Sequence, residues 1–217
     1  MYKTVVFDLD GTLLNTLTDL ADAGNRLCRK YGWPTHERQA YRYFVGNGIP
    51  KLVERLAPAD QRTPAVLEAA LADFKRDYGQ HLRDTTAPYP GIPEMLAKLK
   101  ANGVQLAVFS NKADALAKEV VKDYFGTQYF TIVRGQMTGV PPKPAAEGTN
   151  ALLQALHADP ASTLYVGDSN VDVETAHNAN LPCCGAVWGF RTREELNAAG
   201  AEYLAENSDE LYDVIMK

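Results

Sequence analysis

Residues 5–16, "VVFDLDGTLLNT", decide the fold, because they join an apolar run directly to two acidic residues. The run at residues 5–7 has the character of a buried strand, and Asp8 and Asp10 follow with one residue between them. On a regular strand, side chains at positions i and i+2 point the same way, so these two like charges would lie side by side. Their repulsion needs a compensating group, and a divalent cation is the first candidate.

Four further short apolar runs end in small or polar residues in the same way, which is typical of buried parallel strands. Between the later runs, apolar residues recur at spacings of three and four, which predicts amphipathic helices. This alternation predicts an α/β fold with a Rossmann-like open parallel sheet and right-handed crossovers. The predicted strands lie within residues 4–8, 104–111, 130–135, 162–168 and 183–189, and the predicted helices lie within residues 91–103, 113–125, 145–157 and 171–180.

Residues 16–87 depart from this alternation of strands and helices, because they contain no convincing strand. Helical patterns cover residues 17–32 and 63–82, and the turn-rich "TTAPYPG" at residues 85–91 leads back to the sheet. An α-helical cap domain inserted after the first strand is the simplest interpretation. The predicted domains are a Rossmann-like catalytic core at residues 1–15 and 88–217 and a helical cap at residues 16–87.

The composition is that of an ordinary globular protein with a modest acidic excess: 46% of the 217 residues are hydrophobic, and the formal net charge is −5. An acidic balance argues against nucleic acid as the main partner. No segment reaches the roughly 18–20 apolar residues that a membrane span needs. The three cysteines form no paired framework, and no basic-then-apolar leader precedes the first strand. We therefore expect a cytoplasmic protein without a nucleic-acid or membrane partner, and the sequence leaves its oligomeric state open.

Polar residues follow the predicted strands at their carboxyl ends, which is where open α/β sheets bind ligands. Carboxylates suit a hard cation such as Mg²⁺, and a lysine ammonium suits phosphate oxygens. The backbone N–H groups near Asn111 are expected at the start of the next helix, where they would add anion-binding capacity. The polar residues are Asp8 and Asp10 after the first strand, Ser110 and Asn111 after the second, Lys143 in the loop "VPPKP", and Asp168 and Asp172 after the fourth.

Such a site also contains a nucleophile. A carboxylate can attack phosphorus to form an aspartyl phosphate. A second acid nearby can protonate the leaving alcohol and later accept a proton from the attacking water. The metal and Lys143 would keep one acid ionised while the other transfers protons. This division of roles accounts for two acids one residue apart.

The motifs "DLDGT", "SN" after a strand, a lysine followed by proline, and "GDSNVD" together resemble the four motifs of the haloacid dehalogenase superfamily. The resemblance is to its phosphatases with a helical cap after the first motif, and it spans the core from end to end. It implies that Asp8 is the nucleophile and that Asp10 is the general acid/base. It also implies Mg²⁺ bound by the Asp8 carboxylate, the Asp10 backbone carbonyl and Asp168.

The same resemblance implies roles for the remaining polar residues around a small phosphorylated metabolite. Ser110 and Lys143 would hold the phosphoryl group, with Asn111 beside them. Thr12 would orient the loop or the phosphate, and Gly11 would permit the tight turn. Asp172 would lie in a supporting shell.

Two longer stretches, at residues 44–56 and 166–190, resemble phosphoglycolate phosphatases and their close relatives. This implies hydrolysis of a small phosphomonoester, with 2-phosphoglycolate as the first choice. Pyrophosphatase, sugar-phosphate phosphatase and phosphosugar mutase activities stay open, because these enzymes share the core motifs. A dehalogenase would need neither the metal nor Asp10. A non-catalytic binding protein would usually have lost an acid or the lysine, so we disfavour both.

Several other residues are interpreted as structural. Lys51 and Arg55, one helical turn apart, could meet a second anion on the substrate, but solvated surface charge is the preferred interpretation. Trp188 and Phe190 could line the rim of the site, but packing in the core is the preferred interpretation, and Arg191 is predicted to face solvent.

Overall fold

The computed structural model of the protein describes all 217 residues, which divide into two compact units. Residues 1–15 and 88–217 form the larger unit, and residues 16–87 form the smaller one. The chain crosses between the units through β2 (Leu14–Asn15) and β3 (Ala87–Pro88), which pair in a two-stranded sheet. The smaller unit is therefore an insertion in the sequence of the larger one.

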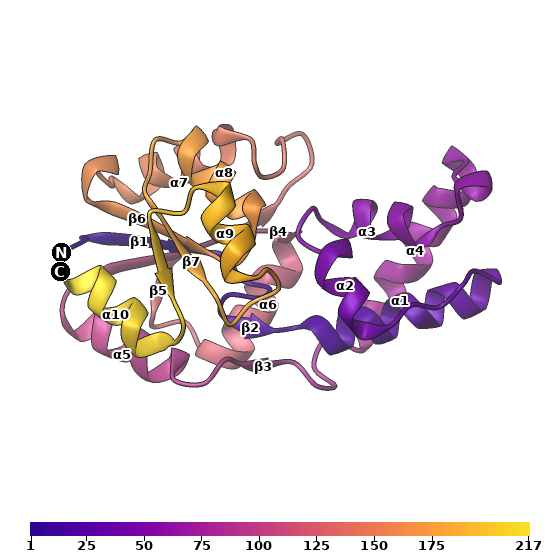
Figure 1. Cartoon of the computed structure of the whole chain (residues 1–217), viewed down its shortest axis with the longest axis horizontal. Coiled ribbons are helices and arrows are strands. Elements are labelled where there is room, and N and C mark those ends of the chain that lie inside the picture. The colour runs from indigo at the N-terminus through magenta and orange to yellow at the C-terminus, as the bar shows by residue number, and fades with distance from the viewer. The chain divides into compact units, whose positions relative to one another are not determined.

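A six-stranded parallel sheet forms the centre of the larger unit and confirms the predicted fold class (Figure 1). Its strands are β1 (Thr4–Phe7), β4 (Gln105–Ala113), β5 (Phe130–Gln136), β6 (Thr163–Gly167), β7 (Cys183–Ala186) and β8 (Tyr203–Ala205). They lie in the order β5-β4-β1-β6-β7-β8, and Val6 of β1 pairs with Ala107 on one side and Tyr165 on the other. Because all six strands run the same way, their carboxyl ends meet at one edge of the sheet.

Helices cover both faces of this sheet (Figure 1). They are α5 (Ile92–Ala101), α6 (Asp114–Phe125), α7 (Ala146–Leu156), α8 (Asn170–Asn178), α9 (Arg193–Ala199) and α10 (Ser208–Met216), with a short 3₁₀ turn at Pro160–Ser162. α5 packs against α10 on one side of the sheet, α7 packs against α8 on the other, and α9 contacts α8. The four helices predicted for this unit are confirmed, whereas α9, α10 and β8 were not predicted.

The sheet is buried, which explains why its central strands are uninterrupted apolar runs. All four residues of β1 and all five of β6 are buried. One apolar cluster packs Val6, Ala107 and Tyr165 against leucines of α7 and against α8. Burial of each large aliphatic side chain contributes roughly 1.5–3 kcal/mol. The core therefore holds the strands in place, and with them the residues at their carboxyl ends.

The smaller unit is helical. Its elements are α1 (Leu17–Tyr31), α2 (Arg38–Phe44), α3 (Ile49–Leu56), a 3₁₀ turn at Ala59–Gln61 and α4 (Pro64–Gln80). α4 begins where the Thr63 hydroxyl accepts a hydrogen bond from the Val66 N–H, with Pro64 at the first helical position. α1 packs against both α2 and α4. The two helices predicted here are confirmed, whereas α2 and α3 were not predicted.

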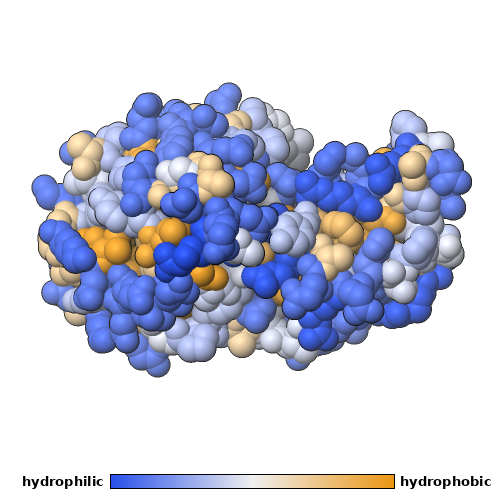
Figure 2. All heavy atoms as spheres, in the orientation of Figure 1, coloured by the Kyte–Doolittle hydropathy of each residue, from blue (hydrophilic) through white to orange (hydrophobic).

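Figure 2 shows a mostly hydrophilic surface on the face in view. None of the helices combines the length and the apolar character that crossing a membrane requires. The large hydrophobic side chains exposed at the surface are Met1, Tyr43, Met137 and Tyr203.

Candidate active site

Asp8 is the first residue after β1 and lies at the carboxyl edge of the sheet. Its N–H donates to the Val166 carbonyl at 2.8 Å, and its Oδ1 lies 2.8 Å from Lys143 Nζ. Burial raises the pKa of Asp8 to about 7, although the Lys143 ammonium opposes this rise and the Asp172 carboxylate adds to it. A buried carboxyl with a shifted pKa beside an ammonium group is typical of catalytic sites.

Lys143 is buried and joins two carboxylates. Its Nζ lies 2.8 Å from Asp8 Oδ1 and 2.7 Å from Asp172 Oδ1. It also donates hydrogen bonds to the Tyr165 hydroxyl at 3.2 Å and to the Phe109 carbonyl at 3.3 Å. Burial alone lowers the pKa of a lysine, but the Asp172 and Asp8 carboxylates overcome it and raise the pKa of Lys143 well above its ordinary value. Lys143 is therefore a fixed positive charge.

Asn111 holds the backbone of Lys143. Its Oδ1 accepts the Lys143 N–H at 2.8 Å, and its Nδ2 donates to the Lys143 carbonyl at 3.2 Å. The helix start expected near Asn111 lies three residues further along the chain, because β4 continues to Ala113 and α6 begins at Asp114. Ser110, the preceding residue, is also buried at this strand end.

Asp172 lies in the first turn of α8 and uses both of its carboxylate oxygens. Oδ1 accepts a hydrogen bond from Lys143 Nζ. Oδ2 accepts the Ser169 N–H at 3.1 Å, which is one half of a capping box at the start of the helix, and it also accepts the Ser169 hydroxyl at 2.7 Å. Because both oxygens are engaged, this geometry favours a supporting role for Asp172 beside Lys143.

Asp168 follows β6 and is held from two sides. Its Oδ1 accepts the Thr12 hydroxyl at 3.1 Å, and its Oδ2 accepts the Phe190 N–H at 2.7 Å. Burial raises the pKa of Asp168 well above its ordinary value, and neighbouring carboxylates add to the rise. Two hydrogen bonds therefore fix the orientation of the Asp168 carboxyl group. Its ionised form is unfavourable unless a cation lies nearby.

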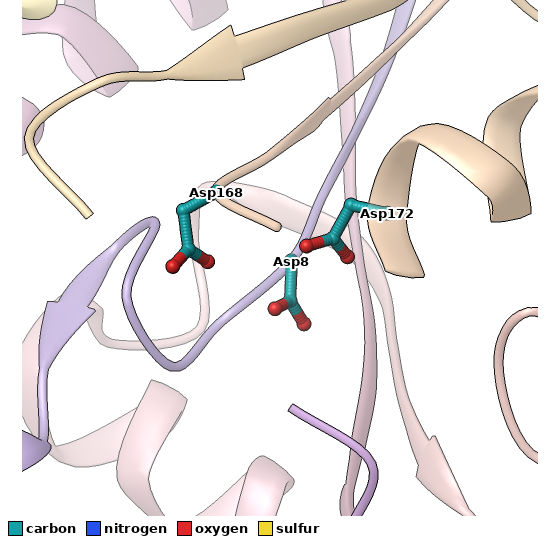
Figure 3. A group of neighbouring side chains, drawn as sticks. All are labelled: Asp8, Asp168 and Asp172. Atoms are coloured by element: carbon teal, nitrogen blue, oxygen red, sulfur yellow. The ribbon is translucent and has the colours of Figure 1, made fainter. Parts of the chain in front are cut away.

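The carboxylates of Asp8, Asp168 and Asp172 gather from two strand ends and a helix (Figure 3). One ligand atom from each lies within 4.8 Å of the others, and all three residues are buried. Lys143 contacts two of these carboxylates, those of Asp8 and Asp172, so the cluster holds more acidic than basic groups. A hard divalent cation with oxygen ligands fits this set of donors and would relieve the repulsion.

Asp10 pairs with a lysine that the sequence analysis did not identify. Lys112 Nζ donates to Asp10 Oδ1 at 3.0 Å and to Oδ2 at 3.3 Å. Each of the two acids in the opening stretch thus has its own lysine, Lys143 for Asp8 and Lys112 for Asp10. The signal that could have identified Lys112 is its place two residues after Ser110, at the carboxyl end of a strand.

The loop after β7 supports the site through Trp188 and Phe190, for which core packing was the preferred interpretation. Trp188 Nε1 donates to the Thr12 carbonyl at 3.0 Å, and the Phe190 N–H reaches Asp168. Phe190 is buried as predicted, but Trp188 is only half-buried. The prediction that Arg191 faces solvent is wrong, since it is 7% exposed.

Two glycines permit the close packing around Asp168. Gly11 has φ of +93°, and a Cβ added there would collide with the Asp168 carboxylate. A Cβ on Gly189 would collide with Asp168 and with the Gly11 carbonyl. The tight turn expected at Gly11 is present, and it brings the loop after β1 against the end of β6.

In the smaller unit, Lys51 and Arg55 have different surroundings. Lys51 is exposed and lies 2.8 Å from Glu54. Arg55 donates to the Phe44 carbonyl at 2.8 Å and to Asn47 Oδ1 at 2.9 Å. Arg55 is thus partly buried, and its hydrogen bonds hold the turn before α3, so it is not only a solvated charge.

Comparison with known proteins shows similarity over nearly the whole chain. A profile of the family described as haloacid dehalogenase-like hydrolase matches residues 5–186. The chain is 31% identical over 216 residues to a phosphoglycolate phosphatase of Chromobacterium violaceum, which covers 98% of this chain and 96% of that protein. It is 31% identical over 191 residues to one of Thiobacillus denitrificans, with 87% and 84% covered. The crystal structure of a predicted phosphoglycolate phosphatase from Haemophilus somnus has a TM-score of 0.89 at 25% identity, with 98% of this chain and 97% of that one covered.

Proposed function

The chain belongs to the haloacid dehalogenase-like hydrolase family, and we propose that it hydrolyses 2-phosphoglycolate or a similar small phosphomonoester. The relatives named phosphoglycolate phosphatase support this choice of substrate. The observation that carries the proposal is the buried Lys143 ammonium, 2.8 Å from Asp8 and 2.7 Å from Asp172 at the carboxyl edge of the sheet. An ammonium group and clustered carboxylates at one strand edge suit phosphoryl transfer.

Asp8 is proposed as the nucleophile and Asp10 as the general acid/base. An oxygen of Asp8 attacks phosphorus, and the bond from phosphorus to the leaving oxygen breaks as Asp10 donates a proton to that oxygen. Water then attacks the phosphorus of the aspartyl phosphate and gives a proton to Asp10, which releases inorganic phosphate and restores Asp8. Lys143 and Ser110 hold the phosphoryl oxygens, while Asn111 keeps Lys143 in place.

We assign a Mg²⁺ site to the Asp8 carboxylate, the Asp10 backbone carbonyl and Asp168. The buried, mutually repelling carboxylates support this assignment. When bound there, Mg²⁺ would neutralise charge on the phosphoryl group and on the carboxylates. Thr12 and Phe190 hold the Asp168 carboxylate in a fixed orientation for this purpose.

The two units would have different roles in the reaction. We assign catalysis to the core at residues 1–15 and 88–217, and selection of the leaving group and exclusion of water to a cap at residues 16–87. A cytoplasmic location is part of the proposal, supported by three cysteines that are all free and buried.

A panel of phosphoesters assayed with Mg²⁺ tests the proposal. Values of kcat/KM for 2-phosphoglycolate, pyrophosphate and sugar phosphates should be highest for 2-phosphoglycolate. Asp8→Asn should lower activity by roughly 10³-fold or more, because the nucleophile is lost. Absence of phosphate release from every ester, or full activity in Asp8→Asn, would refute the proposal. An isomerised sugar phosphate without free phosphate would identify a mutase instead.

A further inference from the structure

The Lys112 side chain is buried, although lysine is among the residues least often buried. It is 3% exposed, and its ammonium lies 3.0 Å and 3.3 Å from the two oxygens of Asp10. Burial of an ammonium is unfavourable unless an opposite charge and hydrogen bonds compensate for the lost water. The contact with Asp10 supplies that compensation, so it explains why a lysine stands at this position.

Lys112 lies where the pairing between β4 and β5 shifts register. From Phe109 to Ala113, β4 advances four residues, while the paired segment of β5 advances two, from Arg134 to Gln136. Extra residues in one strand redirect side chains, and such irregularities are frequent beside active sites. The strand on which Lys112 lies is otherwise held firmly in the core of the sheet.

Asp10, in contrast, stands on the loop between β1 and β2. Both hydrogen bonds of its carboxylate come from Lys112, and its side chain is 20% exposed. A general acid must lie within hydrogen-bond reach of the leaving oxygen, and small displacements lower the rate steeply. We propose that Lys112 is a positioning residue that holds the Asp10 carboxylate where it can exchange protons with the leaving alcohol and with water. This inference rests on the proposed function, in which Asp10 is the acid/base.

Variants of Lys112, with controls, test it on three esters. Lys112→Met removes the charge but keeps the length of the buried chain, and Lys112→Arg keeps the charge. Lys118→Met is the matched control, because Lys118 is an exposed lysine on α6 paired with Asp114. Each is assayed with 2-phosphoglycolate, a simple alkyl phosphate and 4-nitrophenyl phosphate. An alkoxide needs a proton in order to leave, whereas nitrophenolate leaves without one.

Lys112→Met should lower kcat/KM for both alkyl esters by roughly 10–100-fold. The loss on 4-nitrophenyl phosphate should be less than about threefold. Lys112→Arg should restore most of the activity, and Lys118→Met should leave it unchanged. Added to Asp10→Ala, Lys112→Met should cause no further loss, because both act on the same step. The ratio between esters is measured on one sample and does not depend on the fraction of folded protein.

Equal losses on all three esters would overturn the proposal, since they would indicate general damage to the site. A loss confined to 2-phosphoglycolate and expressed in KM would also overturn it, by assigning Lys112 to the substrate's carboxylate. Failure of the proposed function has a different signature, because Asp10→Ala itself would then show no dependence on the leaving group.

Discussion

The charge of Asp8 depends on opposing influences. Burial raises the pKa of Asp8 to about 7, Lys143 opposes the rise and Asp172 adds to it, whereas the ordinary pKa of an aspartate is 3.8. The folded protein therefore binds the Asp8 proton more tightly than the unfolded chain does. The stability linked to this group is fully present below pH 3.8 and is lost as the pH rises through about 7.

Asp8→Asn should consequently stabilise the metal-free protein, and more so at high pH. With a chelator present, we expect the free energy of unfolding to rise by roughly 2–4 kcal/mol at about pH 8 and by less than about 1 kcal/mol at about pH 4.5. Asparagine keeps the shape of the side chain but cannot ionise. Urea denaturation at the two pH values measures the difference, with the exposed Asp22→Asn as control. An equal gain at both pH values would contradict this assignment.

Gly189 should be needed for the orientation of Asp168. Because a methyl group there collides with Asp168 and with the Gly11 carbonyl, Gly189→Ala must displace the carboxylate. We expect Mg²⁺ affinity to fall by about tenfold or more and stability to fall by roughly 1–3 kcal/mol. Calorimetric titration and thermal unfolding measure these effects. Gly79→Ala on α4, with open space at the added Cβ, should be slightly stabilising, and unchanged Mg²⁺ affinity in Gly189→Ala would refute the role.

At the scale of elements, the first turn of α1 is tied to the segment before β3 by one carboxylate. Asp19 is 2% exposed and accepts hydrogen bonds from the N–H and the hydroxyl of both Thr85 and Thr86, at 2.5–2.9 Å. These contacts join the two places where the chain enters and leaves the smaller unit. A buried carboxylate with four donors is a strong local clamp.

Asp19→Asn should therefore lower the free energy of unfolding by roughly 2–4 kcal/mol, because the buried donors lose charge-assisted acceptors. Asp22→Asn, on the same helix but exposed, should change stability by less than about 0.5 kcal/mol. Denaturant titration of both variants gives the comparison. A loss for Asp19→Asn as small as that of the control would show that the clamp contributes no stability.

The central strands could be predicted from sequence because burial makes them continuous apolar runs, as in β1 and β6. β8 escaped prediction because it has three residues at the sheet edge, and one of them, Tyr203, is 40% exposed. Residues at strand ends could be predicted because parallel strands converge. That signal extends to Lys112, but the pairing of Lys112 with Asp10 could not be predicted, because the two residues lie 102 positions apart in sequence.

At the scale of the whole molecule, the candidate site depends on the strand order. β4, β1 and β6 are neighbours in the sheet although they are far apart in sequence, and this order brings Asp8 beside Asp168. Lys143 comes from the loop between β5 and α7, whose path the sequence did not indicate. Asn111 and Tyr165 fix it there by hydrogen bonds. Residues from several parts of the larger unit therefore act together on one carboxylate, that of Asp8, which we propose becomes phosphorylated.

A crystal structure with beryllium fluoride, which mimics a phosphoryl group bonded to a carboxylate, would show which carboxylate is the nucleophile. We expect the mimic to be bonded to an Asp8 carboxylate oxygen, with Lys143 Nζ within hydrogen-bond distance of a fluoride and Mg²⁺ beside Asp8 and Asp168. Beryllium bonded to Asp10 or Asp172 instead, or a mimic that does not bind at this edge of the sheet, would contradict it.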